Sequence, residues 1–115
     1  MTRVAIAGLG TIGRAIARRL ADGMPGLTLA CAAAGDRAKA QAWLKAQGID
    51  CPLVELEAFP DRADLAIECA PAALLERICR PMLEAGKTVM VLSAGAVTHR
   101  ASKAPKAVLK TFLNI

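Results

Sequence analysis

The sequence predicts an α/β fold in which a doubly wound parallel sheet of about five strands lies between two layers of helices. Short apolar runs alternate with amphipathic segments along most of the chain, which is typical of parallel strands joined by crossover helices. The first apolar run also passes directly into a glycine-rich turn. Such a turn favours the strand order 3-2-1-4-5, which places it at the switch point of the sheet.

The first element is a strand over residues 4–7, because these residues form an uncharged apolar run of the kind that is buried on both faces. A helix is predicted over residues 11–21. Its apolar stripe recurs at four-residue spacing and consists of Ile12, Ile16 and Leu20.

A G-x-G-x-x-G pattern joins this strand to this helix. Gly8 permits the tight turn, Gly10 lets a pyrophosphate approach the backbone, and Gly13 lets the helix pack close to the sheet. The free N–H groups at the start of the helix would hold the phosphates. The strand–turn–helix context favours a Rossmann-like dinucleotide site, with Thr11 and Ile12 completing its pyrophosphate loop, over a turn that only packs a helix on a sheet.

The remaining segments continue the alternation of strands and helices. Trp43 is expected in the core, and Pro81 should kink or split the last helix because proline removes a backbone donor. The predicted elements are strands at 27–33, 52–56, 64–70 and 88–92, a helix at 36–47, a short connection at 58–60 and a helix that runs to residue 85.

Three loops are predicted at the carboxyl edge of the sheet, where ligands bind in open α/β sheets. The glycine turn would hold a pyrophosphate, the end of the second strand an adenosine, and the loops after the fourth and fifth strands the nicotinamide side. The residues of those two later loops are Cys69, Ala70, Pro71, Ser93, Ala94 and Gly95.

The residues at the end of the second strand should determine whether the site prefers NAD or NADP. A carboxylate about 20 residues beyond the glycines would bind the ribose hydroxyls, whereas an arginine nearby would accept a 2′-phosphate. Asp36 favours NAD, and Arg37 directly after it leaves NADP open. Asp36 is equally suited to cap the helix that follows.

Composition and charge narrow the function classes. The 13 residues 23–35 are the longest uncharged stretch, short of the ~18 that a membrane span needs. The first strand leaves no room for a signal peptide, so we expect a cytoplasmic protein.

The four cysteines match no metal pattern and are expected to be reduced thiols. The net charge of +5 lies mainly after residue 97, without the aromatic residues that stack bases, so nucleic-acid binding is not expected.

Three stretches together resemble the N-terminal, nucleotide-binding half of the L-aspartate dehydrogenases. They are V-A-I-A-G-L-G-T-I-G-R at 4–14, A-D-L-A-I-E-C-A at 63–70 and L-E-A-G-K-T-V-M-V-L-S-A-G-A at 83–96. The resemblance implies oxidation of L-aspartate with NAD or NADP to iminosuccinate, which hydrolyses to oxaloacetate and ammonia. It assigns the glycine turn and the two later loops to the cofactor. His99 does not match the catalytic histidine of that family, which lies in a second domain.

The chain is therefore expected to hold a dinucleotide-binding domain at 1–97 and a basic tail at 98–115, without catalytic residues or a metal site. All 10 acidic side chains precede residue 98, and this change in charge suggests a truncated or frame-shifted chain. The strand at 88–92 would then form an uncovered apolar edge unless the tail or a second copy covers it, which favours self-association into a homo-oligomer.

Two other functions fit the same residues. A regulatory module that senses NAD(H) without chemistry would need no acid–base group near the three loops. The binding half of a homoserine dehydrogenase-like enzyme would share the glycine turn. Glu68 could serve as a base only if it faced the cofactor edge, and a buried or paired structural carboxylate is the expected alternative.

Overall fold

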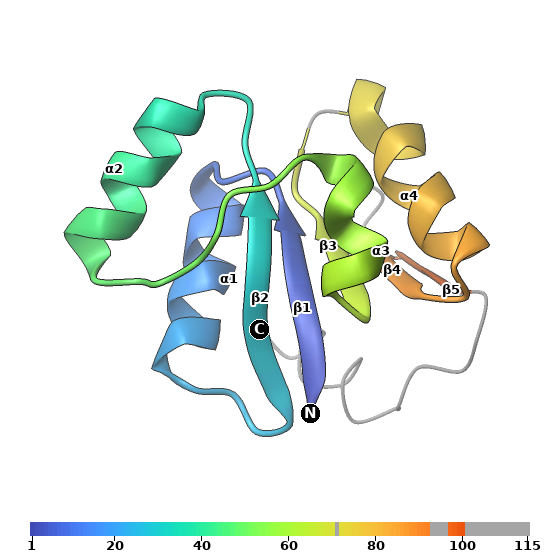
Figure 1. Ribbon diagram of the computed structural model, residues 1–115, viewed down its shortest axis with the longest axis horizontal. Helices are drawn as coiled ribbons and strands as arrows, with labels where there is room; N and C mark the ends of the chain where they lie inside the picture. The colour runs from blue at the N-terminus through green and yellow to red at the C-terminus, as the bar shows by residue number, and fades with distance from the viewer. Residues whose placement is uncertain (71, 93–96, 101–115) are drawn as a thin grey trace.

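The computed structural model of the chain describes residues 1–70, 72–92 and 97–100 (Figure 1). Strands and helices alternate along it as the apolar runs predict. The strands are β1 (Thr2–Ala7), β2 (Leu27–Ala33), β3 (Leu65–Glu68), β4 (Thr88–Val91) and β5 (Val97–Arg100). The helices are α1 (Thr11–Asp22), α2 (Arg37–Gln47), α3 (Phe59–Arg62) and α4 (Leu75–Glu84), and short 3-10 turns span Leu56–Ala58 (η1) and Ala72–Leu74 (η2).

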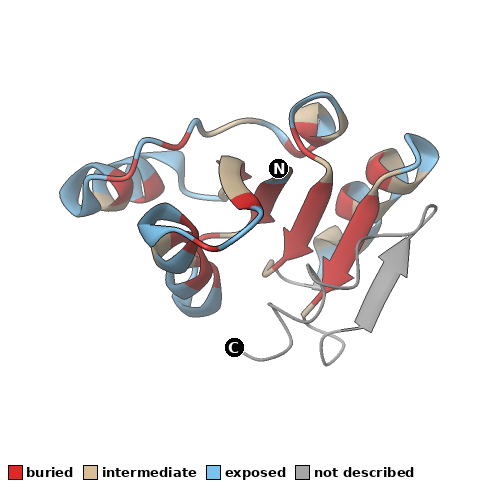
Figure 2. Ribbon diagram, turned by 90° about the horizontal axis from the view of Figure 1, so that it is seen from below, coloured by how far each residue is buried: buried red, intermediate tan, exposed pale blue. Residues whose placement is uncertain are grey.

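The sheet runs in the order β2-β1-β3-β4-β5, and its first four strands are parallel. The helices α1 and α2 cover one face while α3 and α4 cover the other (Figure 1). Figure 2 shows the buried strands between helices whose outer faces are exposed. Ile6 and Ile67 point into the core under α1 and α2, and Ala5 and Ala66 into the core under α3 and α4. The predicted doubly wound α/β class is confirmed.

The strand predicted at 52–56 is reduced to a single parallel bridge between Leu53 and Ala32. The Ala32 amide donates to the Pro52 carbonyl at 3.0 Å, and the Val54 amide donates to the Ala32 carbonyl at 2.8 Å. The ladder stops there because Pro52 has no N–H to donate and the chain turns into η1 at Leu56. The segment therefore lies beside β2, where the predicted order puts it, but contributes no strand.

The edge of β4 is paired rather than open. β5 runs antiparallel to it, with Val91 opposite Val97 and Thr88 opposite Arg100. β5 begins at the predicted boundary between domain and tail, so the first residues of the predicted tail extend the sheet.

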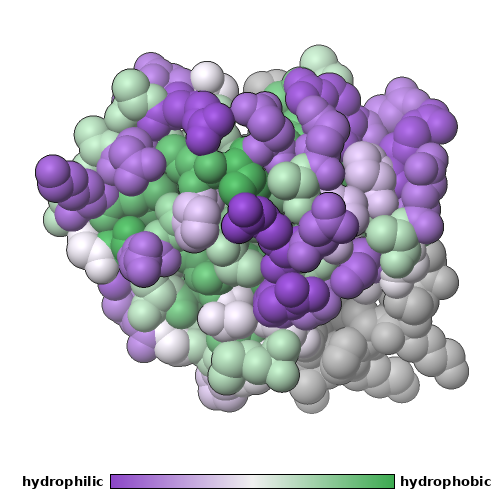
Figure 3. Space-filling view, viewed as in Figure 1, coloured by the Kyte–Doolittle hydropathy of each residue, from purple (hydrophilic) through white to green (hydrophobic). Residues whose placement is uncertain are grey.

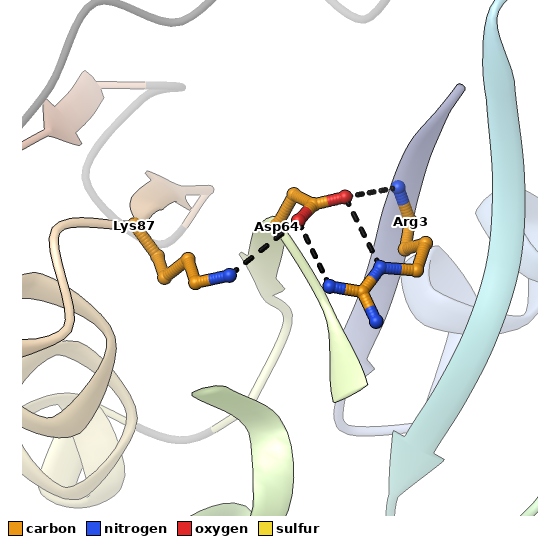
Figure 4. Close-up of polar contacts among 3 residues, drawn as sticks. All are labelled: Arg3, Asp64 and Lys87. Atoms are coloured by element: carbon orange, nitrogen blue, oxygen red, sulfur yellow. Dashed lines mark hydrogen bonds and ion pairs between the residues drawn. The ribbon is translucent and has the colours of Figure 1, made fainter. Parts of the chain in front are cut away.

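The amino edge of the sheet is held by Asp64, which precedes β3 (Figure 4). Its carboxylate accepts from the Arg3 amide at 2.9 Å and from the Arg3 guanidinium at 3.1 and 3.3 Å, and the Lys87 ammonium lies 3.5 Å away. The Arg3 hydrogen bonds lower the pKa of Asp64 to about 2. The starts of β1, β3 and β4 are thereby tied to one side chain.

The last helix is not split by its proline, contrary to one of the two predicted outcomes. α4 continues through Pro81 to Glu84. Ile78 and Met82, on either side of Pro81, are both buried against the sheet and hold the two halves of the helix in place. Among the described residues, no helix combines the length and hydropathy required to cross a membrane.

Candidate functional site

The glycine turn begins at a position that only glycine can occupy. Gly8 has a φ of +102°, and a Cβ on it would lie 2.8 Å from the carbonyl oxygen of Cys69. The Gly8 amide donates to the Ala33 carbonyl at 2.8 Å, and the Cys69 amide donates to the Ala7 carbonyl at 2.8 Å. The ends of β1, β2 and β3 therefore meet at Gly8.

Gly13 sets the position of α1 against the sheet. A Cβ on Gly13 would lie 1.9 Å from the Gly8 carbonyl oxygen and 3.5 Å from the Ile6 side chain. No side chain could stand between helix and turn without moving one of them. The predicted close packing of helix on strand is thus present, and it places the first turn of α1 directly beyond the end of β1.

Gly10 differs from both of these residues because it faces open space. It is the N-cap of α1, no side chain caps the helix there, and an added Cβ would meet nothing within 4 Å. The first N–H groups of a helix have no acceptor within the helix, and they carry the positive end of its dipole. This part of the turn can accept an anion against the backbone, so a pyrophosphate fits the residues present.

A cavity of about 400 Å³ opens in front of the turn. Six of the predicted cofactor residues line it: Gly8, Gly10, Thr11, Asp36, Cys69 and Ala70. Three predicted residues that the structure describes do not, namely Ile12, Gly13 and Arg37. The lining also contains Leu9, Arg14, Ala34, Gly35, Lys39 and Ala40.

A second cavity of about 420 Å³ shares Gly8, Ala34, Gly35 and Ala70 with the first. Its other lining residues include the apolar Ala7, Ala33, Val54, Leu56 and Leu74, with Arg37, Glu55 and Arg77 among them. Figure 3, viewed from the same side as Figure 1, shows hydrophobic surface among hydrophilic side chains on the face where the carboxyl end of β2 lies. The two cavities together follow the carboxyl edge of the sheet.

The two residues predicted to choose the cofactor point to different places. The Asp36 carboxylate accepts from the Lys39 amide at 3.0 Å and caps α2. Arg37 donates to the Glu55 carboxylate at 3.2 Å and to the Leu53 carbonyl at 2.9 Å, and it borders the second cavity. The predicted cap is therefore present, and Arg37 is already engaged by the segment beside β2.

Two cations of the first cavity have no motif in the sequence. The Arg14 guanidinium donates from Nε to the Leu9 carbonyl at 3.1 Å and lies over the Trp43 ring, 5.3 Å from its centroid. Trp43 is half-buried and packs against the core, close to its predicted role. Lys39 enters from α2. The sequence contains one indication of Arg14, namely a basic residue directly after the last glycine of the motif. Nothing in the sequence indicates that Arg14 and Lys39 lie near each other, because only the packing of α1 beside α2 brings them to the same cavity.

Ile12 was predicted to join the buried stripe of α1, and that prediction is wrong. Ile12 is 60% exposed. The buried residues of α1 are Gly13, Ile16, Ala17 and Leu20, because Gly13, and not Ile12, is the residue of the first turn that contacts the sheet. Ile12 is thereby left on the outer side of the helix start.

Neither Cys69 nor Glu68 is placed for acid–base chemistry. Burial raises the pKa of the Cys69 thiol to about 12, with a smaller contribution from Glu68. Glu68 is fully buried and lines neither of the two cavities, so it is a buried structural carboxylate as expected. The predicted site residues Pro71, Ser93, Ala94 and Gly95 lie outside the described residues. Within the described part of the chain, no group of three metal-binding side chains comes together.

Comparison with known proteins gives a family and two groups of relatives. The family model described as homoserine dehydrogenase, NAD binding domain, matches residues 8–107. L-aspartate dehydrogenase 3 of Bordetella bronchiseptica is 43% identical over 95 residues, which cover 82% of this chain and 35% of the relative. L-aspartate dehydrogenase of Bradyrhizobium diazoefficiens is 41% identical over 95 residues, 83% of this chain and 34% of the relative. The chain thus spans about a third of the length of the curated relatives it matches.

Solved structures share the fold at lower identity. Scyllo-inositol dehydrogenase from Lactobacillus casei, with bound NAD(H) and scyllo-inositol, is 21% identical with a TM-score of 0.65 over 78% of this chain and 27% of its own. Biliverdin reductase from Synechocystis, in complex with biliverdin and NADP+, is 22% identical with a TM-score of 0.66 over 78% of this chain and 28% of its own.

Proposed function

Because this chain belongs to the family of NAD-binding domains of homoserine dehydrogenase type, we propose that it is the cofactor-binding part of an oxidoreductase similar to L-aspartate dehydrogenase. The observation that carries the proposal is the glycine turn, in which Gly8 and Gly13 have no room for a side chain while Gly10 faces a cavity. The identity of 43% to an L-aspartate dehydrogenase supports aspartate as the substrate.

The residues divide the cofactor among three loops. The backbone of Gly10 and Thr11 would hold the pyrophosphate at the start of α1, while Ala34, Gly35 and Asp36 would border the adenosine ribose. Cys69, Ala70 and Pro71, with Ser93, Ala94 and Gly95, would flank the nicotinamide side. When bound, the dinucleotide accepts the hydride that leaves the amino acid.

The proposed reaction of the complete oxidoreductase is oxidation of L-aspartate to iminosuccinate, followed by hydrolysis to oxaloacetate and ammonia. Among the described residues that line the first cavity, Asp36 is the one carboxylate, and it caps α2. The general acid–base group and the aspartate-binding residues would come from a second domain. We therefore propose that this chain binds the dinucleotide without turning over aspartate by itself.

Calorimetric titration of the chain with NAD and with NADP, together with an assay of nucleotide reduction by aspartate, tests this proposal. We expect saturable binding of at least one dinucleotide and no turnover. Absence of binding would contradict the cofactor site. Turnover in the ordinary enzyme range of about 1–10³ s⁻¹ would contradict the need for a second domain.

The family description favours a second candidate, the binding half of a homoserine dehydrogenase-like enzyme. Two chimeras separate the candidates: one joins residues 1–97 to the remainder of the Bordetella relative, and the other joins them to the remainder of a homoserine dehydrogenase. Nucleotide reduction with aspartate by the first chimera, without reduction with homoserine by the second, supports the first candidate. A module that senses NAD(H) without chemistry is supported by the cavity lining, and it predicts binding but no activity in any such chimera.

Two further properties belong to the proposal. A reducing, cytoplasmic setting is supported by the four cysteines, which are free thiols. Self-association is supported by the place of β5 as the last strand of the described sheet, since an edge strand offers unpaired backbone groups to a second copy. Light scattering at two chain concentrations would measure the oligomeric state.

A further inference from the structure

The last residue of β2 and the two residues that follow it carry no side chain that could hydrogen-bond to a ribose hydroxyl. β2 ends at Ala33, and the next two residues, Ala34 and Gly35, both line the first cavity. In dinucleotide-binding sheets a carboxylate near this position binds the 2′-hydroxyl, and its charge disfavours a phosphate there. The first carboxylate after β2 is Asp36, which already accepts the Lys39 amide as the cap of α2.

Two basic side chains border the same cavity from different helices. Arg14 comes from α1 and Lys39 from α2. Neither forms an ion pair with a carboxylate in the part of the chain that the structure describes, whereas Arg37 is paired with Glu55. Arg14 is also held in one orientation by the Leu9 carbonyl and the Trp43 ring, so little rotamer freedom remains to be lost on binding.

On the basis of the proposed function, we propose that this cavity selects a dinucleotide that carries a 2′-phosphate, and that Lys39 is the residue that determines the preference. A phosphate monoester carries about −1.5 to −2 charges at pH 7. Among the described residues of the lining, two cations and one carboxylate leave a net positive charge for this phosphate. Asp36 is exposed, so solvent and salt weaken its opposing charge.

The test compares NAD with NADP by calorimetric titration of the full chain. We expect NADP to bind at least about tenfold more tightly than NAD, in line with a charge-assisted phosphate contact. Lys39→Gln should remove most of this tenfold preference by weakening NADP alone, with NAD affinity unchanged within about twofold. Lys39→Arg should keep it. Each variant changes only the Lys39 side chain, so the Lys39 backbone N–H can still donate to Asp36 and the cap of α2 is retained.

Lys45→Gln is the matched control, because Lys45 lies on the same helix, is exposed and lines neither cavity. It removes the same charge from α2, so it should leave the preference for NADP intact. Equal loss in the two glutamine variants would overturn the role of Lys39, because it would show an effect of net charge. Circular dichroism of each variant verifies the fold.

Salt provides a second readout. Raising the salt concentration should reduce the preference for NADP in the wild-type chain, and the reduction should be smaller in Lys39→Gln. NAD binding as tight as NADP binding, or tighter, would overturn the inference while leaving the proposed function in place. Failure of both dinucleotides to bind would instead overturn the proposed function, and this inference with it.

Discussion

At the scale of single residues, the glycines of the turn make two separable contributions. Gly13→Ala should destabilise the chain by about 2–4 kcal/mol, since its methyl group would overlap the Gly8 carbonyl and force the helix from the sheet. Gly10→Ala should change the free energy of unfolding by less than about 1 kcal/mol, yet weaken dinucleotide binding. Urea denaturation and calorimetric titration measure the two effects. A similar loss of stability in both variants would contradict this division.

Asp64 should make the free energy of unfolding depend on pH in the acidic range. The pKa of Asp64 is about 2 in the folded chain, whereas its ordinary value is 3.8. Its contribution to the free energy of unfolding is therefore complete at pH values above 3.8 and is lost as the pH falls through the pKa of the folded chain. The side chains of Arg3 and Asp64 are 46% and 38% exposed, which reduces the contribution to about 1 kcal/mol.

Asp64→Asn should therefore lower the free energy of unfolding by about 1 kcal/mol at pH 7, with the difference from wild type shrinking between about pH 4 and pH 2. Urea denaturation at several pH values measures it. Asp50→Asn is the control, because Asp50 is exposed and makes no ion pair among the described residues. A constant difference across the pH range would rule out the carboxylate as its source.

The thiols should be slow to react in the folded chain. Burial raises the pKa of Cys51 and of Cys69 to about 12, and it raises the pKa of Cys31 and of Cys79 as well. Because the thiolate is the reactive form, a disulfide reagent at pH 8 should modify the native thiols at least about tenfold more slowly than the same thiols in denaturant. A thiol that reacts at once in the native chain would contradict these shifts.

At the scale of elements, periodicity and turn chemistry predicted most of the fold. The helix after β2 was predicted with its cap and its end, because Asp36 and Gly48 are strong signals at either terminus. Residues 52–56 show why the rest was harder: their alternation is typical of a strand, but Pro52 cannot donate to a ladder. The antiparallel pairing of β5 follows from contact with β4 and has no local signal.

The candidate site divides in the same way. Its backbone part, around Gly8 and Gly10, could be predicted because glycine spacing reflects local geometry. Its cationic part could not, since Arg14 and Lys39 come together only through the packing of two helices. Arg37 was predicted as the residue that would accept the 2′-phosphate of NADP, and its ion pair with Glu55 holds it beside the second cavity instead of the first.

The cap of α2 offers a test of what Asp36 does. Asp36→Ala should cost about 1 kcal/mol of folding stability, whereas Asp36→Ser should recover most of it, because a hydroxyl oxygen can also accept the Lys39 amide. Thermal unfolding measures this directly. If Asp36 acts only as a cap, the NAD affinity of both variants should match that of the wild-type chain. A large loss of NAD binding in both would assign the carboxylate to the ribose instead.

At the scale of the whole molecule, the site joins three strands that are distant in sequence. The Gly8 amide bonds to the end of β2 and the Cys69 amide to the end of β1, so a ligand at the turn contacts residues that follow β1, β2 and β3.

Hydrogen exchange should reveal this arrangement. A bound dinucleotide is expected to slow amide exchange in segments 8–14, 34–40 and 69–70 together, because binding stabilises the closed state that all three share. Mass spectrometry of peptides measures it, with residues 45–50 as the internal control. Protection centred on Arg3 and Asp64 would place the ligand at the opposite edge.

The contacts among Arg3, Asp64 and Lys87 (Figure 4) hold together the starts of the strands, and none of the three residues lines either cavity. A protein engineer could therefore rewrite residues 34–39 to suit another adenosine-bearing molecule while the strand starts stay in register. The chain would then serve as a small scaffold for nucleotide sensors, because the contacts that stabilise the sheet and the loops that determine ligand specificity lie at opposite ends of the strands.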